Sequence, residues 1–280
     1  MALSPAGMLN AIALWGNYRV IAGIAYAPGP RHSLDVYAPE PAHTAAPVVV
    51  FFYGGNWQEG DKAMYRFVGS ALAARGLVTV IPDYRVYPEV RFPGFLEDGA
   101  LAVRWAHDHA AEFGGDPGRM VLMGHSAGAH IAAMLTYDRQ WLTSVGLDAN
   151  RDIKGLVGLS GPYDFLPLYD PTLKIIFGPE EHRAVTQPIN FVETGAPPAF
   201  LASGRQDASV NPGNATRLGR RIVEKGGVAT VTFYDHVGHR SLIGAFAAPL
   251  RPLAPVLRDT VAFIDRVTGG TAPLLAASPQ

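Results

Sequence analysis

Residues 120–137 read MVLMGHSAGAHIAAMLTY, and this stretch decides the fold. The apolar run before Gly124 is typical of a buried strand, whereas the residues after Gly128 have a helical pattern. Gly124 and Gly128 stand two residues on either side of Ser126. Glycine suits both positions because a tight strand-to-helix turn is strained and a bulky side chain would clash with the neighbouring strand or helix. We therefore expect a strand, a sharp turn that presents Ser126, and a helix.

The rest of the chain repeats this alternation of apolar runs and helical segments. The runs are continuous, which indicates strands buried on both faces, as in a parallel sheet. Strands and helices in alternation imply right-handed crossovers and a doubly wound sheet. We expect strands at Val48–Tyr53, Leu77–Ile81, Met120–Met123, Ile153–Leu159, Ala199–Ala202 and Ala229–Tyr234, and helices near 62–75, 94–113, 127–137, 213–226 and 254–267.

No internal repeat, charge block or low-complexity linker divides the chain, so residues 1–280 are expected to form a single α/β domain. An antiparallel hairpin within 18–38 is expected to open the sheet, and Asp116–Arg119 to form the turn into a later strand. Residues 161–198 break the alternation with several prolines and scattered aromatic residues. We expect a lid-like excursion there, over the carboxyl edge of the sheet where such folds bind ligands.

Composition excludes several classes of function. The chain has 23 basic and 24 acidic residues, a formal net charge of -1 and no cysteine. It has no basic stripe for nucleic acid or for a membrane surface, and neither disulfides nor a cysteine nucleophile are possible. Its apolar runs stay far below the roughly 18 residues of a membrane span. We expect small-molecule partners, and the sequence leaves the oligomeric state open between monomer and dimer.

Location and cofactors follow from absent signals. The first residues do not resemble a signal peptide, so the chain as it stands is expected to be cytoplasmic, or secreted or periplasmic if a leader was removed. No histidine–carboxylate cluster has the spacing of metal ligands, so we expect no metal and no cofactor.

A serine hydroxyl becomes a good nucleophile only when a base takes its proton. His239 follows the last predicted strand in a Gly-His step, and the loop there is expected to bring its imidazole over Ser126. His236 is the alternative base. His125 and His130 flank the serine, and we expect them to pack or to support rather than to react.

A carboxylate is then needed to orient the imidazole, in the chain order serine, acid, histidine. Asp207 follows the strand at Ala199–Ala202 and is the preferred candidate. Asp164, after the preceding strand, and Asp235, close to His239 in sequence, remain alternatives.

The segment Phe52–Trp57 (FYGGNW) follows the first long apolar strand, and its glycines allow close approach to a substrate. We expect an oxyanion hole formed by the backbone N–H groups of Gly55, Asn56 and Ala127. An apolar pocket is expected to be lined by Trp57, Phe165, Leu166 and Phe177. Trp57 fits the core equally well.

Together these motifs resemble the α/β-hydrolase serine esterases related to hormone-sensitive lipase and to kynurenine formamidase (BD-FAE type). The Gly-His-Ser-Ala-Gly at 124–128 is the form that their elbow commonly takes, and the likeness extends over about residues 30–265. It is carried further by Asp83-Tyr84-Arg85, Tyr87-Pro88-Glu89, Phe92-Pro93, Glu97-Asp98, Gly115-Asp116-Pro117, Gly204–Val210 and Gly238-His239.

The resemblance implies an α/β-hydrolase fold with a mostly parallel, twisted sheet of eight or so strands, helices on both faces and a small lid, supplied by 4–18 and 161–190. Tyr53 departs from the pattern, because these families usually carry there a histidine that supports the oxyanion loop. We predict a carboxylic ester hydrolase that cleaves small to medium acyl esters through an acyl-enzyme. An arylformamidase-like amide hydrolase remains open, as does a non-catalytic hydrolase fold that binds a ligand.

Overall fold

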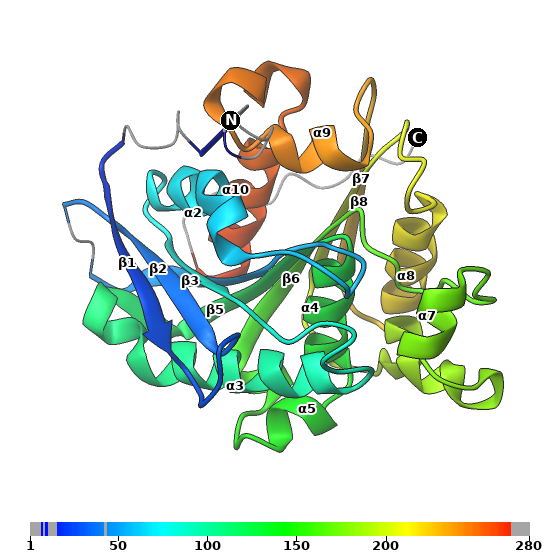
Figure 1. Ribbon diagram of the computed structural model, residues 1–280. Coiled ribbons are helices and arrows are strands. Elements are labelled where there is room, and N and C mark those ends of the chain that lie inside the picture. The colour runs from blue at the N-terminus through cyan, green and yellow to red at the C-terminus, as the bar shows by residue number, and fades with distance from the viewer. Residues whose placement is uncertain (1–6, 8, 11–15, 42–43, 270–280) are drawn as a thin grey trace.

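The computed structural model describes residues 7, 9, 10, 16–41 and 44–269. These residues form an eight-stranded sheet in the order β1-β2-β4-β3-β5-β6-β7-β8 (Figure 1). The two contacts of β2 are antiparallel and all the others are parallel. The strands are β1 (Tyr18–Ala25), β2 (Ser33–Pro39), β3 (Ala46–Phe52), β4 (Val78–Pro82), β5 (Gly115–His125), β6 (Ile153–Leu159), β7 (Ala199–Gly204) and β8 (Ala229–Tyr234).

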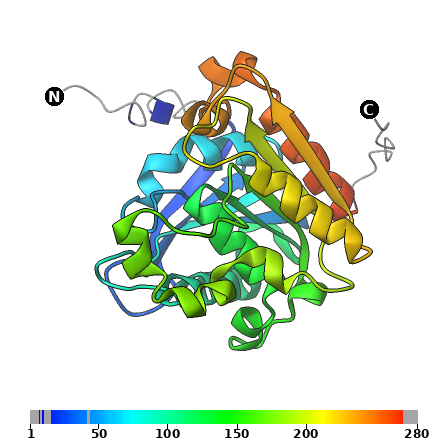
Figure 2. The ribbon, with the colours of Figure 1, turned by 90° about the vertical axis from the view of Figure 1, so that its right-hand side faces the viewer.

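Helices cover both faces of this sheet. One face carries α2 and α10, and the opposite face carries α3, α4 and α8 (Figures 1 and 2). The alternation along β7 agrees with this arrangement, because Phe200 stacks on Phe263 of α10 while the next residue, Leu201, faces Gly219 of α8. These helices are α2 (Arg66–Ala73), α3 (Gly94–His109), α4 (Ala127–Tyr137), α8 (Gly213–Glu224) and α10 (Val256–Val267).

The core lies around the central strands β3 and β5. Every residue from Val48 to Phe52 is fully buried, as is every residue from Met120 to Met123. Both strands have a helix layer above and below, so side chains on both faces must be apolar. Each such side chain contributes about 1.5–3 kcal/mol of transfer free energy on burial. This central block fixes the carboxyl edge from which the site residues project.

The turn expected at Asp116–Arg119 lies within the bounds of β5. Ala46 pairs with Gly115 but Val48 pairs with Met120, so the intervening residues of β5 bulge out of the ladder. Gly118 N–H donates to Asp116 Oδ1 at 2.8 Å, which closes the bulge as an aspartate turn. The local turn chemistry is as predicted, whereas the strand begins earlier than predicted.

Residues 161–198 connect β6 to β7 through three short helices. These are α7 (Pro171–Ile176), η3 (Glu180–Thr186) and η4 (Pro188–Phe191). The last of them packs between α4 and α8, on the face of the sheet that those helices cover. Most of the other segment expected to form a cap, 4–18, lies outside the described residues. None of the helices that the structure describes has the length and apolar character needed to cross a membrane.

Candidate active site

Ser126 lies at the turn between β5 and α4. Its backbone angles are φ 56° and ψ -125°, a strained conformation for a residue with a side chain. A Cβ on Gly124 would lie 2.2 Å from the carbonyl oxygen of Gly128, and a Cβ on Gly128 would lie 2.1 Å from that of Phe52. Strand and helix therefore meet backbone against backbone, which only glycine permits. The predicted turn is present, and it presents the serine hydroxyl at the carboxyl edge of the sheet.

His239 follows β8, the last strand of the sheet, and its side chain contacts Ser126. Its Nε2 lies 2.8 Å from Ser126 Oγ. The residue was expected in a loop, but it is the first residue of a short helix, α9 (His239–Gly244), which follows β8 (Figure 1). A helical backbone at this position restricts the imidazole more than a free loop would.

Asp207 completes the contact on the other side of the imidazole. Its Oδ2 and Oδ1 lie 2.9 Å and 3.1 Å from His239 Nδ1. Oδ1 also accepts hydrogen bonds from the backbone N–H groups of Ser209 and Val210, at 3.0 Å and 2.9 Å. Burial would raise the pKa of Asp207, but the hydrogen bonds from His239 and Val210 outweigh it and hold the pKa below its usual range. The carboxylate is therefore ionised wherever His239 can act as a base.

The loops that carry Asp207 and His239 are tied to each other. Gln206 N–H donates to the carbonyl oxygen of Val237 at 3.1 Å. A Cβ on Gly204 would lie 2.1 Å from that same oxygen, so the two loops touch along their backbones. The acid and the histidine thus leave neighbouring strands, β7 and β8, as one connected unit.

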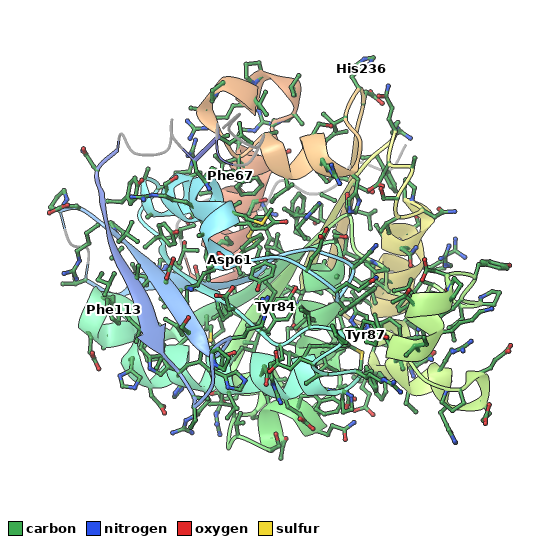
Figure 3. All side chains as sticks on the ribbon, in the orientation of Figure 1. Asp61, Phe67, Tyr84, Tyr87, Phe113 and His236 are labelled. Carbon is green, nitrogen blue, oxygen red and sulfur yellow. The ribbon has the colours of Figure 1, made fainter. Side chains whose placement is uncertain are left out.

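The alternative residues lie elsewhere. Asp164 pairs with Arg217, and Asp235 pairs with Arg205 at 2.9 Å on the surface. His236 is exposed at the outer tip of the loop after β8, as Figure 3 shows. The structure therefore brings together the three preferred residues and none of these alternatives.

The loop after β3 passes directly beside Ser126. A Cβ on Gly54 would lie 2.9 Å from Ser126 Cβ. Gly55, Asn56 and Trp57 then have φ values of 145°, 54° and 58°, a run of left-handed residues that turns the chain sharply. Within the described residues, the N–H groups of Gly55, Asn56 and Ala127 have no hydrogen-bond acceptor. Unpaired donors beside a serine suit an oxygen that develops negative charge.

Tyr53 anchors this loop in place of the expected histidine. Its hydroxyl donates to Asp83 Oδ1 at 2.8 Å and accepts from Arg31 Nη2 at 3.0 Å. Its carbonyl oxygen accepts from the Tyr84 hydroxyl at 2.6 Å, and the two rings stack with centroids 4.7 Å apart. Lys62 Nζ neutralises Asp83 from 2.8 Å. The loop therefore starts from a fully buried, hydrogen-bonded residue.

Arg31 is a support that the sequence did not reveal. It lies between β1 and β2, and besides Tyr53 it donates to the carbonyl oxygens of Tyr84 and Gly60, at 2.8 Å in both cases. No motif marks it, since its partners are more than twenty residues away in the chain.

Three of the four expected pocket residues meet. Trp57 packs edge-on against Phe177, with centroids 4.8 Å apart, and stacks on Phe165 at 5.9 Å. His130 adds a fourth ring, 5.1 Å from Trp57. Leu166 does not join them, because it is 37% exposed at the surface. Trp57 and Phe177 are each only 3% exposed, so this aromatic cluster is filled by its own rings.

A hollow lies on the outer side of Phe177. Its volume is about 240 Å³, and its lining comes mainly from α7 and η3. No residue of the Ser126–His239–Asp207 contact borders it. In the part of the chain that the structure describes, no three histidine or carboxylate side chains gather as metal ligands would.

The mixed sheet and the serine at its carboxyl edge define an α/β-hydrolase. The sequence profile of the BD-FAE family matches residues 34–222, so the chain belongs to the BD-FAE family. The chain is 31% identical over 240 residues to a protein of Arabidopsis thaliana named probable isoprenylcysteine alpha-carbonyl methylesterase ICMEL1, covering 78% of this chain and 50% of that protein. It is 31% identical to Esterase LipC of Mycobacterium tuberculosis, covering 67% and 51%.

The chain thus spans about half the length of these curated relatives. Among solved structures, a truncated carbohydrate esterase from gut microbiota matches with a TM-score of 0.79 at 22% identity, over 90% of this chain and 98% of that one. Esterase 2 of Thermogutta terrifontis matches with a TM-score of 0.73 at 24% identity, over 92% and 97%. The predicted α/β-hydrolase fold and the resemblance to its esterases are both confirmed.

Proposed function

We propose that the protein is a serine carboxylesterase that works through an acyl-enzyme. The observation that carries this proposal is the continuous chain of short contacts from Ser126 Oγ through His239 to Asp207, at 2.8 Å and 2.9 Å. Such a chain lets an imidazole remove the serine proton while a carboxylate stabilises the imidazolium that forms. The names of the relatives, methylesterase and esterase, support an ester as the substrate.

The proposed reaction proceeds in two halves. His239 Nε2 takes the proton of Ser126 while Oγ attacks the ester carbonyl carbon. The N–H groups of Gly55, Asn56 and Ala127 hold the resulting oxyanion. The imidazolium then gives its proton to the leaving alcohol, and the acyl group stays on the serine. In the second half, His239 takes a proton from water as the water oxygen attacks the acyl carbon. The imidazolium then returns a proton to Ser126 Oγ as the bond between Oγ and the acyl carbon breaks, and the acid is released.

We propose small to medium acyl groups as substrates. Trp57 follows the oxyanion loop directly, and its ring is packed by Phe165, Phe177 and His130. Rings that fill their own space leave little room for a long acyl chain beside the nucleophile. Phe165 and Phe177 come from the 161–198 excursion, which supports its role as a small lid within one domain.

Turnover of p-nitrophenyl acetate, butyrate and octanoate by the wild type, with Ser126→Ala as the blank, tests the proposal. We expect turnover of the shorter esters, loss of activity in Ser126→Ala, and attachment of an uncharged alkyl phosphonate to Ser126 in the wild type, read by peptide mass spectrometry. An absence of turnover together with an unmodified Ser126 would overturn it. A higher kcat/KM for N-formylkynurenine than for aryl acetates would assign the same residues to an amide hydrolase.

A further inference from the structure

His125, the residue directly before the nucleophile, touches the backbone of the proposed base. It is the last residue of β5, and it is only 3% exposed. Its Nε2 lies 3.0 Å from the carbonyl oxygen of His239. A carbonyl oxygen can only accept a hydrogen bond, so the ring carries its proton on Nε2 and donates it to His239.

The ring is held tightly on its other sides. Its centroid lies 4.8 Å from that of the His239 imidazole, at an interplanar angle of 43°. A Cβ on Gly54 would come within 3.2 Å of His125 Nδ1, so the oxyanion loop closes one side of the ring. Nδ1 is buried and, within the described residues, has no hydrogen-bond partner. Among the residues that the structure describes, His239 is therefore the one hydrogen-bond partner of this side chain.

We infer that His125 is a positioning residue, which fixes the backbone of His239 to the nucleophile turn so that imidazole and hydroxyl keep their distance. This inference rests on the proposed function. Ser126 and His239 are 113 residues apart in the chain. One hydrogen bond from the neighbour of the first to the main chain of the second restrains their separation locally, in addition to the path through β6, β7 and β8.

The charge of His125 suits this position. The titratable groups that act on it are His239, whose positive form disfavours a second charge, and Asp207, whose negative charge has a smaller and opposite effect. Burial and the neighbouring His239 lower the pKa of His125 to about 3. The ring therefore stays neutral when His239 takes the serine proton, and two adjacent cations never form.

A displacement of the base by about 1 Å can cost about 100-fold in rate, because proton transfer depends on contact geometry. We therefore expect His125→Ala to lower kcat for p-nitrophenyl butyrate by about 10- to 100-fold. KM should change by less than about twofold, because the His125 side chain contacts none of the residues proposed to bind the substrate. His125→Gln keeps an N–H donor at nearly the same reach, and it should restore kcat to within about threefold of the wild type.

His130 offers a matched control for the loss of a buried histidine. It also donates from Nε2 to a backbone carbonyl, that of Thr186, at 2.8 Å, and burial lowers its pKa to about 4. Its side chain shares no hydrogen bond with the three site residues within the described part of the chain, and its backbone N–H, which donates to the carbonyl oxygen of Ser126, is kept in an alanine variant. His130→Ala should therefore lose comparable folding stability while the contact between His239 and Asp207 stays intact. Because His130 packs on Trp57, ester turnover is not used for this control.

A second measurement does not depend on ester turnover. The proton between His239 Nδ1 and Asp207 gives a low-field proton NMR signal when their hydrogen bond is well formed, and His239→Ala identifies it by abolishing it. We expect the signal to broaden or vanish in His125→Ala and to persist in His125→Gln and His130→Ala. Should the wild type cleave no ester while the signal follows this pattern, the proposed function fails and the positioning role stands.

Any of three results would overturn the positioning role. One is an unchanged signal and an unchanged kcat in His125→Ala. Another is a loss of kcat/KM in His125→Ala that comes from KM alone. The last is a loss of the NMR signal in His130→Ala as well as in His125→Ala. Either of these would show a general packing effect.

Discussion

Asp207 illustrates how much a single carboxylate depends on its donors. Three N–H groups, from His239, Ser209 and Val210, converge on two oxygens. Asp207→Asn retains the shape, but its amide can present a donor to His239 Nδ1 and so favour the wrong tautomer. We expect kcat to fall about 10²- to 10⁴-fold with little change in KM. Steady-state kinetics on p-nitrophenyl butyrate measures this, and circular dichroism checks that the variant is folded.

The lowered pKa of Asp207 leads us to expect that the stability of the protein depends on pH. Its pKa in the folded protein lies below the ordinary value of 3.8, so the unfolded chain binds the proton first. Its contribution is therefore present above 3.8 and is lost as the pH falls toward the folded pKa. Denaturant titrations should show the stability difference between wild type and Asp207→Asn shrinking as the pH falls from about 5 to about 2. A difference that grows on acidification would contradict the sign.

Tyr53→Phe tests the anchor of the oxyanion loop. The change removes the hydroxyl that donates to Asp83 and accepts from Arg31, while the ring and its stacking on Tyr84 remain. Asp83 Oδ1 keeps the N–H of Lys62 and Arg31 Nη2 keeps the carbonyl oxygen of Gly60, so the cost is that of two ordinary hydrogen bonds, about 1–3 kcal/mol together. We expect the free energy of unfolding to fall by that amount and kcat to fall severalfold, as the donors beside Ser126 loosen. Tyr87→Phe, a change of the same kind at an incompletely buried tyrosine, serves as the control.

For single residues, the sequence predicted the reactive side chains better than the residues that hold them in place. Ser126, Asp207 and His239 each follow a recognisable strand, so their meeting could be expected. The contact of Arg31 with Tyr53 joins the β1–β2 turn to the end of β3, and no local pattern encodes it. Leu166 was expected in the pocket because it is apolar, but apolarity alone does not tell an exposed leucine from a buried one.

Among the elements, the turn from β5 to α4 tolerates the least change. Gly128→Ala would place Cβ 2.1 Å from the backbone oxygen of Phe52, an atom that a central strand cannot move. We expect a loss of at least about 3 kcal/mol of stability, or no folded protein. Gly99→Ala in α3 is the matched control, because its nearest neighbour, at 3.0 Å, is the movable side-chain tip of Leu135. That variant should stay within about 1 kcal/mol of the wild type in denaturant unfolding.

A further prediction concerns Phe177 in the 161–198 excursion. This residue belongs to the aromatic cluster and also lines the outer hollow. Phe177→Ala removes the ring beside Trp57 and opens the filled cluster toward the hollow that Phe177 lines. The ratio of kcat/KM for p-nitrophenyl octanoate to that for acetate should rise by about tenfold, at a stability cost of about 3–5 kcal/mol. Tyr169→Ala, which truncates an 82% exposed ring of the same excursion, should leave the ratio unchanged.

Element prediction succeeded where burial imposes a pattern and failed where it does not. The continuous apolar runs gave β3, β6, β7 and β8 within two residues, and α4 at both ends. The one-turn helices α5 (Gln140–Thr143) and α6 (Ala149–Asp152) went unpredicted, as did α7 and α9. A helix of four to six residues is shorter than the stretch over which periodicity shows, and its stability comes from packing.

For the molecule as a whole, the order of the strands places the three site residues unequally. Ser126 follows β5, which is hydrogen-bonded on both sides by β3 and β6. His239 follows β8, which ends the sheet and pairs with β7 alone. Most residues of β8 are only half buried, whereas β5 is fully buried from Met120 to Met123. The proposed nucleophile and the proposed base therefore follow a central strand and an edge strand of the sheet.

On warming, the proposed esterase activity should therefore decline before the protein unfolds. Amide protons of β8 should exchange with deuterium faster than those of β5, because an edge strand frays while the centre stays closed. When β8 frays, the contact between His239 and Ser126 is lost. Activity should therefore decline at temperatures several degrees below the cooperative unfolding transition seen by circular dichroism, and it should return on cooling. Coincident loss of activity and secondary structure would show instead that the last strand and the centre open as one.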